Sequence, residues 1–128
     1  MRAALILVAA AISAPLAAAS GHTSLPGVSD EETAISSGAI KDFHRGHGDV
    51  LFVGDRTDRW YRVALNEGCL DGPMQLRRVV FESSAASQRI DRFTKVAFPD
   101  DLRSCSIKSI RRSAPPPQVD ADSPVTLD

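Results

Sequence analysis

The middle of the chain alternates short apolar segments with polar turns. Asp49–Val53 is apolar after its first residue, and Trp60–Leu65 follows a turn-forming stretch that begins at Gly54. Two β-prone segments about six residues apart are typical of a hairpin. Because side chains alternate along a strand, one face of the second segment is expected in the core. The residues of that face are Tyr61, Val63 and Leu65. Those of the opposite face are Trp60, Arg62 and Ala64.

Three later segments also have strand character: Arg78–Glu82, Arg89–Phe98 and Cys105–Ile110. In the second segment the apolar residues Ile90, Phe93 and Val96 are three residues apart, whereas Phe98 follows Val96 after two. This change of spacing, with the β-prone composition, favours a strand interrupted by a bulge. A tight turn or one helical turn is expected at Pro99–Asp101. Short strands separated by turns predict a mainly β fold. We expect one small antiparallel sheet, arranged as a meander, sandwich or barrel, with at most one short helical turn.

The N-terminus has the layout of a cleavable secretory signal. Arg2 precedes an apolar run, and small residues end at Ala19, which predicts a signal peptide over residues 1–19. The run is shorter than the roughly 20 residues needed to span a membrane, so a retained anchor is disfavoured. The sequence therefore predicts a periplasmic or secreted protein with no stable membrane span.

The remaining chain divides by composition into three parts. Residues 20–38 are polar and small, which predicts a flexible leader, although Ser29 could begin a short helix through a capping box. Residues 114–128 are rich in proline and acidic, which predicts a disordered tail. The β domain is expected to occupy residues 39–113 between them.

Cys69 and Cys105 are the two cysteines of the chain. An exported protein meets an oxidising compartment, where a lone pair of cysteines becomes a disulfide. Closing this loop of about 37 residues is expected to stabilise the fold by about 3 to 4 kcal/mol. A redox-active pair is the weaker alternative, because the two residues lack the C-x-x-C spacing that lowers a thiol pKa.

Charge is distributed unevenly along the chain. Residues 20–55 hold two basic and six acidic residues, residues 56–112 hold twelve basic and seven acidic, and residues 113–128 hold three acidic. The net charges of these parts are therefore −4, +5 and −3. The basic middle favours an anionic partner, with a solvated polar face as the simpler alternative.

An aromatic side chain beside arginines suits the binding of anionic groups. If the strands pair as expected, such a surface lies on the outer face of the hairpin and its neighbours. The candidate residues of this surface are Trp60, Arg62, Arg59, Arg78 and Arg92. The alternative is that Trp60 closes one end of the core while the arginines keep the sheet soluble. An envelope protein or an anionic polymer is the expected partner, and nucleic acid is not expected.

Catalytic signatures are weak. His44 and His47 have metal-ligand spacing on a helix, but the adjacent glycines favour a loop or a strand end. The serines lack a G-x-S-x-G context, and the acid pair Asp100 and Asp101 fits a helix cap better than a glycosidase site. The chain has no glycine-rich phosphate loop, so no cofactor is expected. No catalytic or metal-ligating residue is therefore assigned.

Several blocks together resemble one family of small exported proteobacterial proteins, classed as a domain of unknown function. The blocks are RWYRVAL at Arg59–Leu65, Cys69, an apolar strand at Arg78–Glu82, IDRF at Ile90–Phe93 and CSIKSIRRSAPP at Cys105–Pro116. The resemblance spans roughly residues 40–116 and lies in the combination of blocks. It implies a one-domain envelope protein with paired cysteines, and it carries over no catalytic residue.

These patterns favour an exported, non-enzymatic cell-envelope protein that binds a protein or an anionic envelope component. The alternative is a small periplasmic hydrolase or metal-dependent enzyme that uses His44 and His47.

Overall fold

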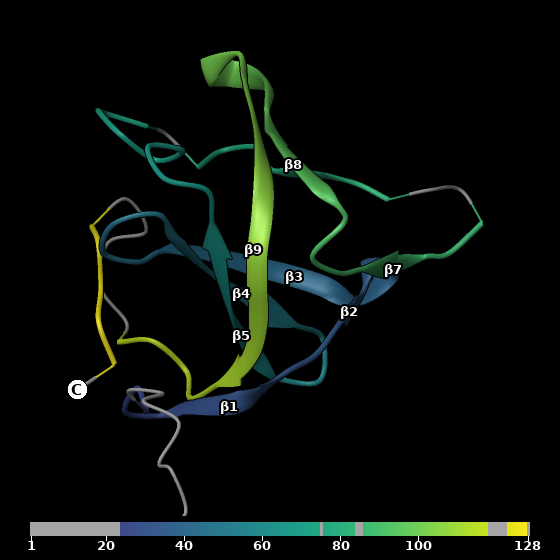
Figure 1. The fold of residues 1–128 in the computed structure, drawn as a ribbon, viewed down its shortest axis with the longest axis vertical. Coiled ribbons are helices and arrows are strands. Elements are labelled where there is room, and N and C mark those ends of the chain that lie inside the picture. Colours follow the sequence, from purple (N-terminus) through teal and green to yellow (C-terminus); the bar gives the residue numbers. More distant parts are fainter. Residues whose placement is uncertain (1–23, 75, 84–85, 118–122, 128) are drawn as a thin grey trace, which may run out of the picture.

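The computed structural model describes residues 24–74, 76–83, 86–117 and 123–127. The predicted signal peptide lies outside these residues. The described chain forms nine strands and two short 3-10 turns, with no helix long and apolar enough to cross a membrane (Figure 1). In chain order the elements are β1 (Val28–Glu32), β2 (Ile35–Ser36), η1 (Ser37–Ala39), β3 (Ile40–Arg45), β4 (Val50–Asp55), β5 (Trp60–Leu65), β6 (Val80–Glu82), β7 (Arg89–Ile90), β8 (Lys95–Phe98), η2 (Pro99–Asp101) and β9 (Arg103–Ser113).

The main sheet is antiparallel and has the strand order β3-β4-β5-β9-β8-β6. Strand β9 is the longest, and it crosses the centre of the view in Figure 1. One of its edges pairs with β5, whereas β8 and β1 share the other edge. Strands β2 and β7 form a second, two-stranded sheet. The mainly β, antiparallel fold predicted from the sequence is confirmed.

The sheet curls until side chains from its two outermost strands meet. Phe43 of β3 and Phe81 of β6 stack with their ring centroids 6.0 Å apart. Both rings also pack against the main hydrophobic core. The curled sheet therefore encloses one core, and β3 and β6, at opposite ends of the strand order, both contribute to it.

The core follows the predicted alternation of β5. Tyr61, Val63 and Leu65 are buried in it, together with Cys69 and Cys105. The core residues contributed by β4, β8 and β9 include Leu51, Val53, Val96, Phe98, Ile107 and Ile110. A β-bulge in the pairing of β9 with β5 shifts the alternation within β9. Both Ile107 and Ile110, three residues apart, therefore reach the core.

The N-terminal segment differs from the expected flexible leader. Residues 28–32 form β1, which pairs with the end of β9. Ile35 of β2 is 1% exposed and pairs with Ile90 of β7. The capping-box residue Ser29 lies in a strand rather than a helix. The physical reason is that β8 pairs only with the first part of one β9 edge, Arg103–Ser106, and β1 pairs with Arg111 and Ser113 on the same edge.

The C-terminal segment also differs from the expected disordered tail. The backbone N–H of Val125 donates to the carbonyl of Arg45 at 3.1 Å, and Val125 forms a parallel bridge with Gly46. Its side chain is 6% exposed. A short apolar pattern within a proline-rich stretch thus packs onto the sheet, because an apolar surface is available there.

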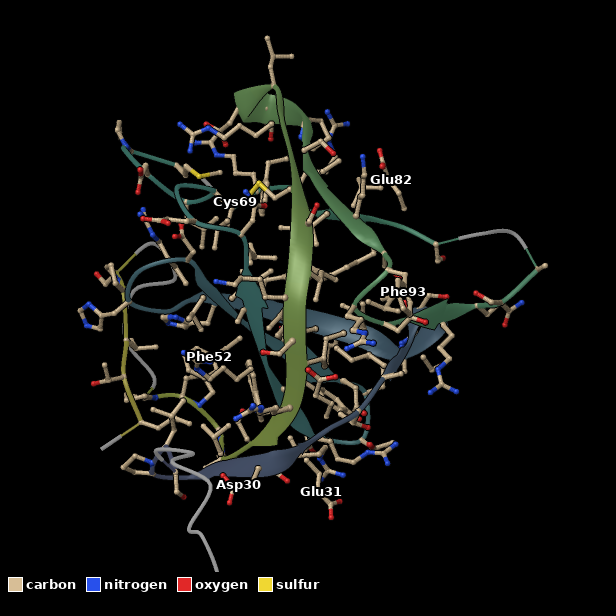
Figure 2. All side chains as sticks on the ribbon, viewed as in Figure 1. Asp30, Glu31, Phe52, Cys69, Glu82 and Phe93 are labelled. Carbon is tan, nitrogen blue, oxygen red and sulfur yellow. A yellow bond between two sulfur atoms is a disulfide. The ribbon has the colours of Figure 1, made fainter. Side chains whose placement is uncertain are left out.

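The segment 89–98, expected to be one bulged strand, is divided into β7 and β8. The Asp91 carboxylate accepts the Phe93 N–H at 2.9 Å, and the Thr94 hydroxyl accepts the Asp91 N–H at 3.1 Å. These bonds form a turn that replaces the strand ladder. Phe93 lies on this turn and is 81% exposed, so it takes no part in the core (Figure 2). Strand β3 was not assigned from the sequence.

The predicted disulfide between Cys69 and Cys105 is confirmed. It joins the loop of residues 66–74 to β9 near the upper end of the view in Figure 2. The Asp49 carboxylate accepts the N–H groups of Gly68 and Leu70, both at 2.9 Å. The hydrogen bond from Leu70 and the other contacts of Asp49 hold the pKa of this carboxyl below its usual value.

Two arginines hold the same loop through its carbonyl groups. Arg103 donates to the carbonyls of Cys69 at 2.9 Å and Asp71 at 2.6 Å. Arg45 donates to the carbonyl of Leu70 at 2.6 Å. The loop is therefore tied to β3 and β9 by hydrogen bonds as well as by the disulfide.

The double substitution of Cys69 and Cys105 by alanine is expected to lower the free energy of unfolding by about 3 to 4 kcal/mol, because the unfolded chain regains the entropy of an open loop. Urea denaturation of the oxidised protein and the variant measures this difference. A loss below about 1 kcal/mol would contradict a structural role for the bridge.

The turn between β4 and β5 is organised by the buried carboxylate of Asp55, which is 2% exposed. It accepts hydrogen bonds from the N–H and hydroxyl of Thr57, at 2.8 and 2.7 Å, and from the N–H and Nε of Arg59, at 3.0 and 3.1 Å. Burial by itself would raise the pKa of Asp55. The hydrogen bonds from Thr57 and Arg59 and the charge of Arg59 outweigh it and lower the pKa to about 2.

The folded-state pKa of Asp55 lies below its unfolded value, so this carboxylate stabilises the fold fully above about pH 4 and loses the effect as pH falls toward 2. Asp55→Asn is therefore expected to lower stability at pH 7 by about 1 to 3 kcal/mol, with the deficit narrowing between pH 4 and pH 2. Chemical denaturation at a series of pH values measures both stabilities. A deficit that stays constant over this range would contradict the assignment.

Candidate functional site

The structure places three of the five predicted surface residues in separate ion pairs. Arg59 pairs with Asp55 at 3.1 Å in the β4–β5 turn. Arg78 pairs with Asp100, an η2 residue, at 3.5 Å.

Arg92 reaches Glu32 of β1 at 3.9 Å, and its guanidinium lies over the Phe93 ring at 5.1 Å. These three arginines therefore have acidic partners at different places in the fold. The structure does not gather them around Trp60.

Trp60 and Arg62 do share the outer face of β5, opposite the core residues of that strand. Trp60 packs against a second hydrophobic cluster formed by Val50, Phe52 and Val125. The indole ring lies over Gly54 of β4, where an added Cβ atom would be 3.0 Å from its Cζ2 atom. The sheet thus has an apolar patch on its outer face, and glycine at position 54 leaves room for the indole.

The covering of this patch comes from the C-terminal segment. Val125 lies within the cluster, and Leu127 packs against it. Figure 2 shows Phe52 on the side of the sheet along which this segment runs. The outer face of β4 is therefore shielded by residues that the sequence assigned to a disordered tail.

The neighbour of Arg62 on this face is a residue that sequence reasoning did not select. Arg62 of β5 lies directly opposite Arg111 of β9 in the strand register. Neither side chain has an ion pair with any described carboxylate, and the buried Nε of Arg111 has no hydrogen-bond partner among the described residues. Burial, with the charge of Arg111, lowers the pKa of Arg62. We call these two residues the arginine pair.

The sequence held only a weak signal for Arg111. The expected strand ended at Ile110, one residue before it. The bulge between β5 and β9 then sets which β9 residues face outward, so the strand pattern of β9 alone did not place Arg111 beside Arg62.

A pocket of about 340 Å³ is lined by Arg62, one member of the arginine pair. Its lining combines outer-face residues of β4 and β5 with residues from both ends of the described chain. The lining includes Val28, Val50, Phe52, Arg62, Val125 and Leu127. The pocket is therefore mostly apolar, with an arginine in its wall.

The two histidines of the enzymatic alternative have different surroundings. His44 is a buried residue of β3, and its Nδ1 lies 3.1 Å from the carbonyl oxygen of Arg45. His47 is exposed in the β3–β4 turn and lines the pocket. Within the described ranges, no group of three or more histidine, cysteine or acidic residues is arranged to hold a metal ion.

Fold and site together define a disulfide-linked antiparallel β protein with an arginine pair beside a covered apolar patch. Comparison of the chain with protein families, curated proteins and solved structures found no match. The resemblance to the exported family described above stays a prediction.

Gly54→Ala is expected to tilt Trp60 away from β4, because the new methyl group would lie about 3.0 Å from the indole. We expect a loss of about 1 to 3 kcal/mol in unfolding free energy and a red shift of the fluorescence of Trp60, the single tryptophan of the chain. Gly38→Ala is the matched control, since nothing lies within 4 Å of its added Cβ. Equal stability and equal emission in the two variants would contradict the packing of Trp60 on Gly54.

Proposed function

We propose that this protein is an exported, non-enzymatic cell-envelope protein that binds an anionic envelope component through Arg62 and Arg111. The observation that carries the proposal is the direct cross-strand pairing of two arginines that form no ion pair with a described carboxylate. Glu32 of β1 lies opposite Arg111 on the other edge of β9, but its carboxylate pairs with Arg92.

Like charges directly opposite each other on a sheet destabilise it. An anion between the two guanidinium groups would remove this repulsion. Arginine suits this role because its planar group donates two parallel hydrogen bonds to a carboxylate or phosphate. Trp60, on the same face of β5, adds an aromatic surface beside the cations.

Export is supported by two features. The first nineteen residues have the pattern of a secretory signal. The Cys69–Cys105 disulfide is the kind of bond that persists in oxidising compartments such as the periplasm. Both features fit a protein that works outside the cytoplasm.

The proposal is tested by the melting temperature in inorganic phosphate, compared with chloride at equal ionic strength. Phosphate is expected to raise the melting temperature of the natural sequence by several degrees once its concentration far exceeds the dissociation constant. The double variant Arg62→Gln with Arg111→Gln should lose this response. In the absence of phosphate, Arg62→Gln alone should be more stable by about 0.2 to 1 kcal/mol, because the repulsion is gone.

Arg56→Gln is the matched control, because it removes the same charge from an exposed position in the β4–β5 turn. It should keep the full phosphate response. A response of equal size in the double variant would reject the arginine pair as the anion site.

A further inference from the structure

The arginine pair belongs to one row of residues across five strands. His44 of β3 lies opposite Phe52 of β4, Phe52 lies opposite Arg62 of β5, and Arg62 lies opposite Arg111 of β9. Glu32 of β1, which pairs with Arg92, ends the row opposite Arg111. Neighbouring strands are about 4.8 Å apart, so the row passes from an aromatic ring to two cations within about 10 Å. Polarity therefore changes sharply across this face of the sheet.

The pocket lies at this change in polarity. Phe52 and Val50 supply apolar surface from β4, and Arg62 enters the same lining from β5. Val28 of β1 and Leu127 near the C-terminus also line it. The pocket thus combines an apolar interior with a cationic edge.

The size of the pocket limits what it can hold. Its volume of about 340 Å³ lies at the lower end of the range for small-molecule sites, about 300 to 1,000 Å³. One narrow apolar chain suits this space better than a pair of acyl chains. The C-terminal wall is fixed to β3 by the hydrogen bond from the Val125 N–H to the Arg45 carbonyl.

We infer that the ligand is a single-chain amphiphile whose anionic head group binds Arg62 and Arg111 and whose apolar chain enters the pocket between β4 and the chain ends. This inference rests on the proposed function for its head group and adds the chemical class of the ligand. A carboxylate and a phosphate monoester share the required head-group chemistry.

The test uses the full-length, disulfide-bonded protein and a series of straight-chain carboxylates from acetate to decanoate, below their micelle concentrations. Binding is measured by calorimetry and by the fluorescence of Trp60, which packs against the cluster that includes Phe52. Affinity is expected to rise roughly fourfold for each methylene group that enters the pocket. Decanol, which lacks the charge, should bind at least tenfold more weakly than decanoate. Decyl phosphate in place of decanoate shows which of the two head groups the pair prefers.

Val28→Phe is designed to fill the pocket while Arg62 and Arg111 themselves stay unchanged. Val28 is half-buried in β1 and lines the pocket, and phenylalanine is well tolerated in strands. This variant should lose the dependence on chain length and keep the phosphate response of the melting temperature. Val80→Phe is the matched control, because Val80 is an exposed strand residue outside the pocket lining. It should bind decanoate as the natural sequence does.

The outcomes separate the inference from the proposed function. Equal affinity for acetate and decanoate, with the phosphate response intact, would contradict the inference that the ligand is an amphiphile. The proposed anion site would not be contradicted by this result. Unchanged decanoate binding in Val28→Phe would also overturn it, because the chain would then bind elsewhere. If the natural sequence neither binds decanoate nor responds to phosphate, both the amphiphile inference and the proposed anion site are wrong. Decanoate binding that survives Arg62→Gln with Arg111→Gln would reject the arginine pair as the head-group site.

Discussion

Strand β9 uses the backbone groups of both its edges, and the arrangement of the sheet depends on this pairing. One edge holds β5, and with it the β3–β4–β5 part of the sheet. The other edge is shared by β8 and β1, which come from distant parts of the sequence. Because buried backbone groups need hydrogen-bond partners, an eleven-residue strand fixes the positions of three other strands at once.

The two faces of the sheet have different roles. The inner face is closed by the curl of the sheet, which brings Phe43 and Phe81 together over a well-packed core. The outer face carries a smaller apolar cluster, and Val125 and Leu127 of the C-terminal segment cover it in place of a second sheet. The arginine pair lies beside this cover, where burial raises the energetic cost of unpaired charge. This cost is the physical basis for the proposed anion site.

Arg45 connects the disulfide-linked loop with the covered outer face. Its guanidinium donates to the Leu70 carbonyl, and its own carbonyl accepts the Val125 N–H. That carbonyl oxygen also lies 3.1 Å from Nδ1 of His44, next to it in β3. The position of the C-terminal segment is thereby linked to the loop that the Cys69–Cys105 bond holds. Through Arg45, the end of β3 thus contacts both the disulfide-linked loop and Val125, which lines the pocket.

The sequence by itself determined the β class, the core face of β5 and the disulfide. Strand alternation is a local property, and two cysteines allow a single intramolecular pairing. Only the tertiary structure decided that residues 28–32 and Val125 join the sheet, and that Arg111 lies opposite Arg62. These features depend on which strand edges stay unpaired and on a bulge that shifts the register, so they arise from contacts between residues distant in the chain.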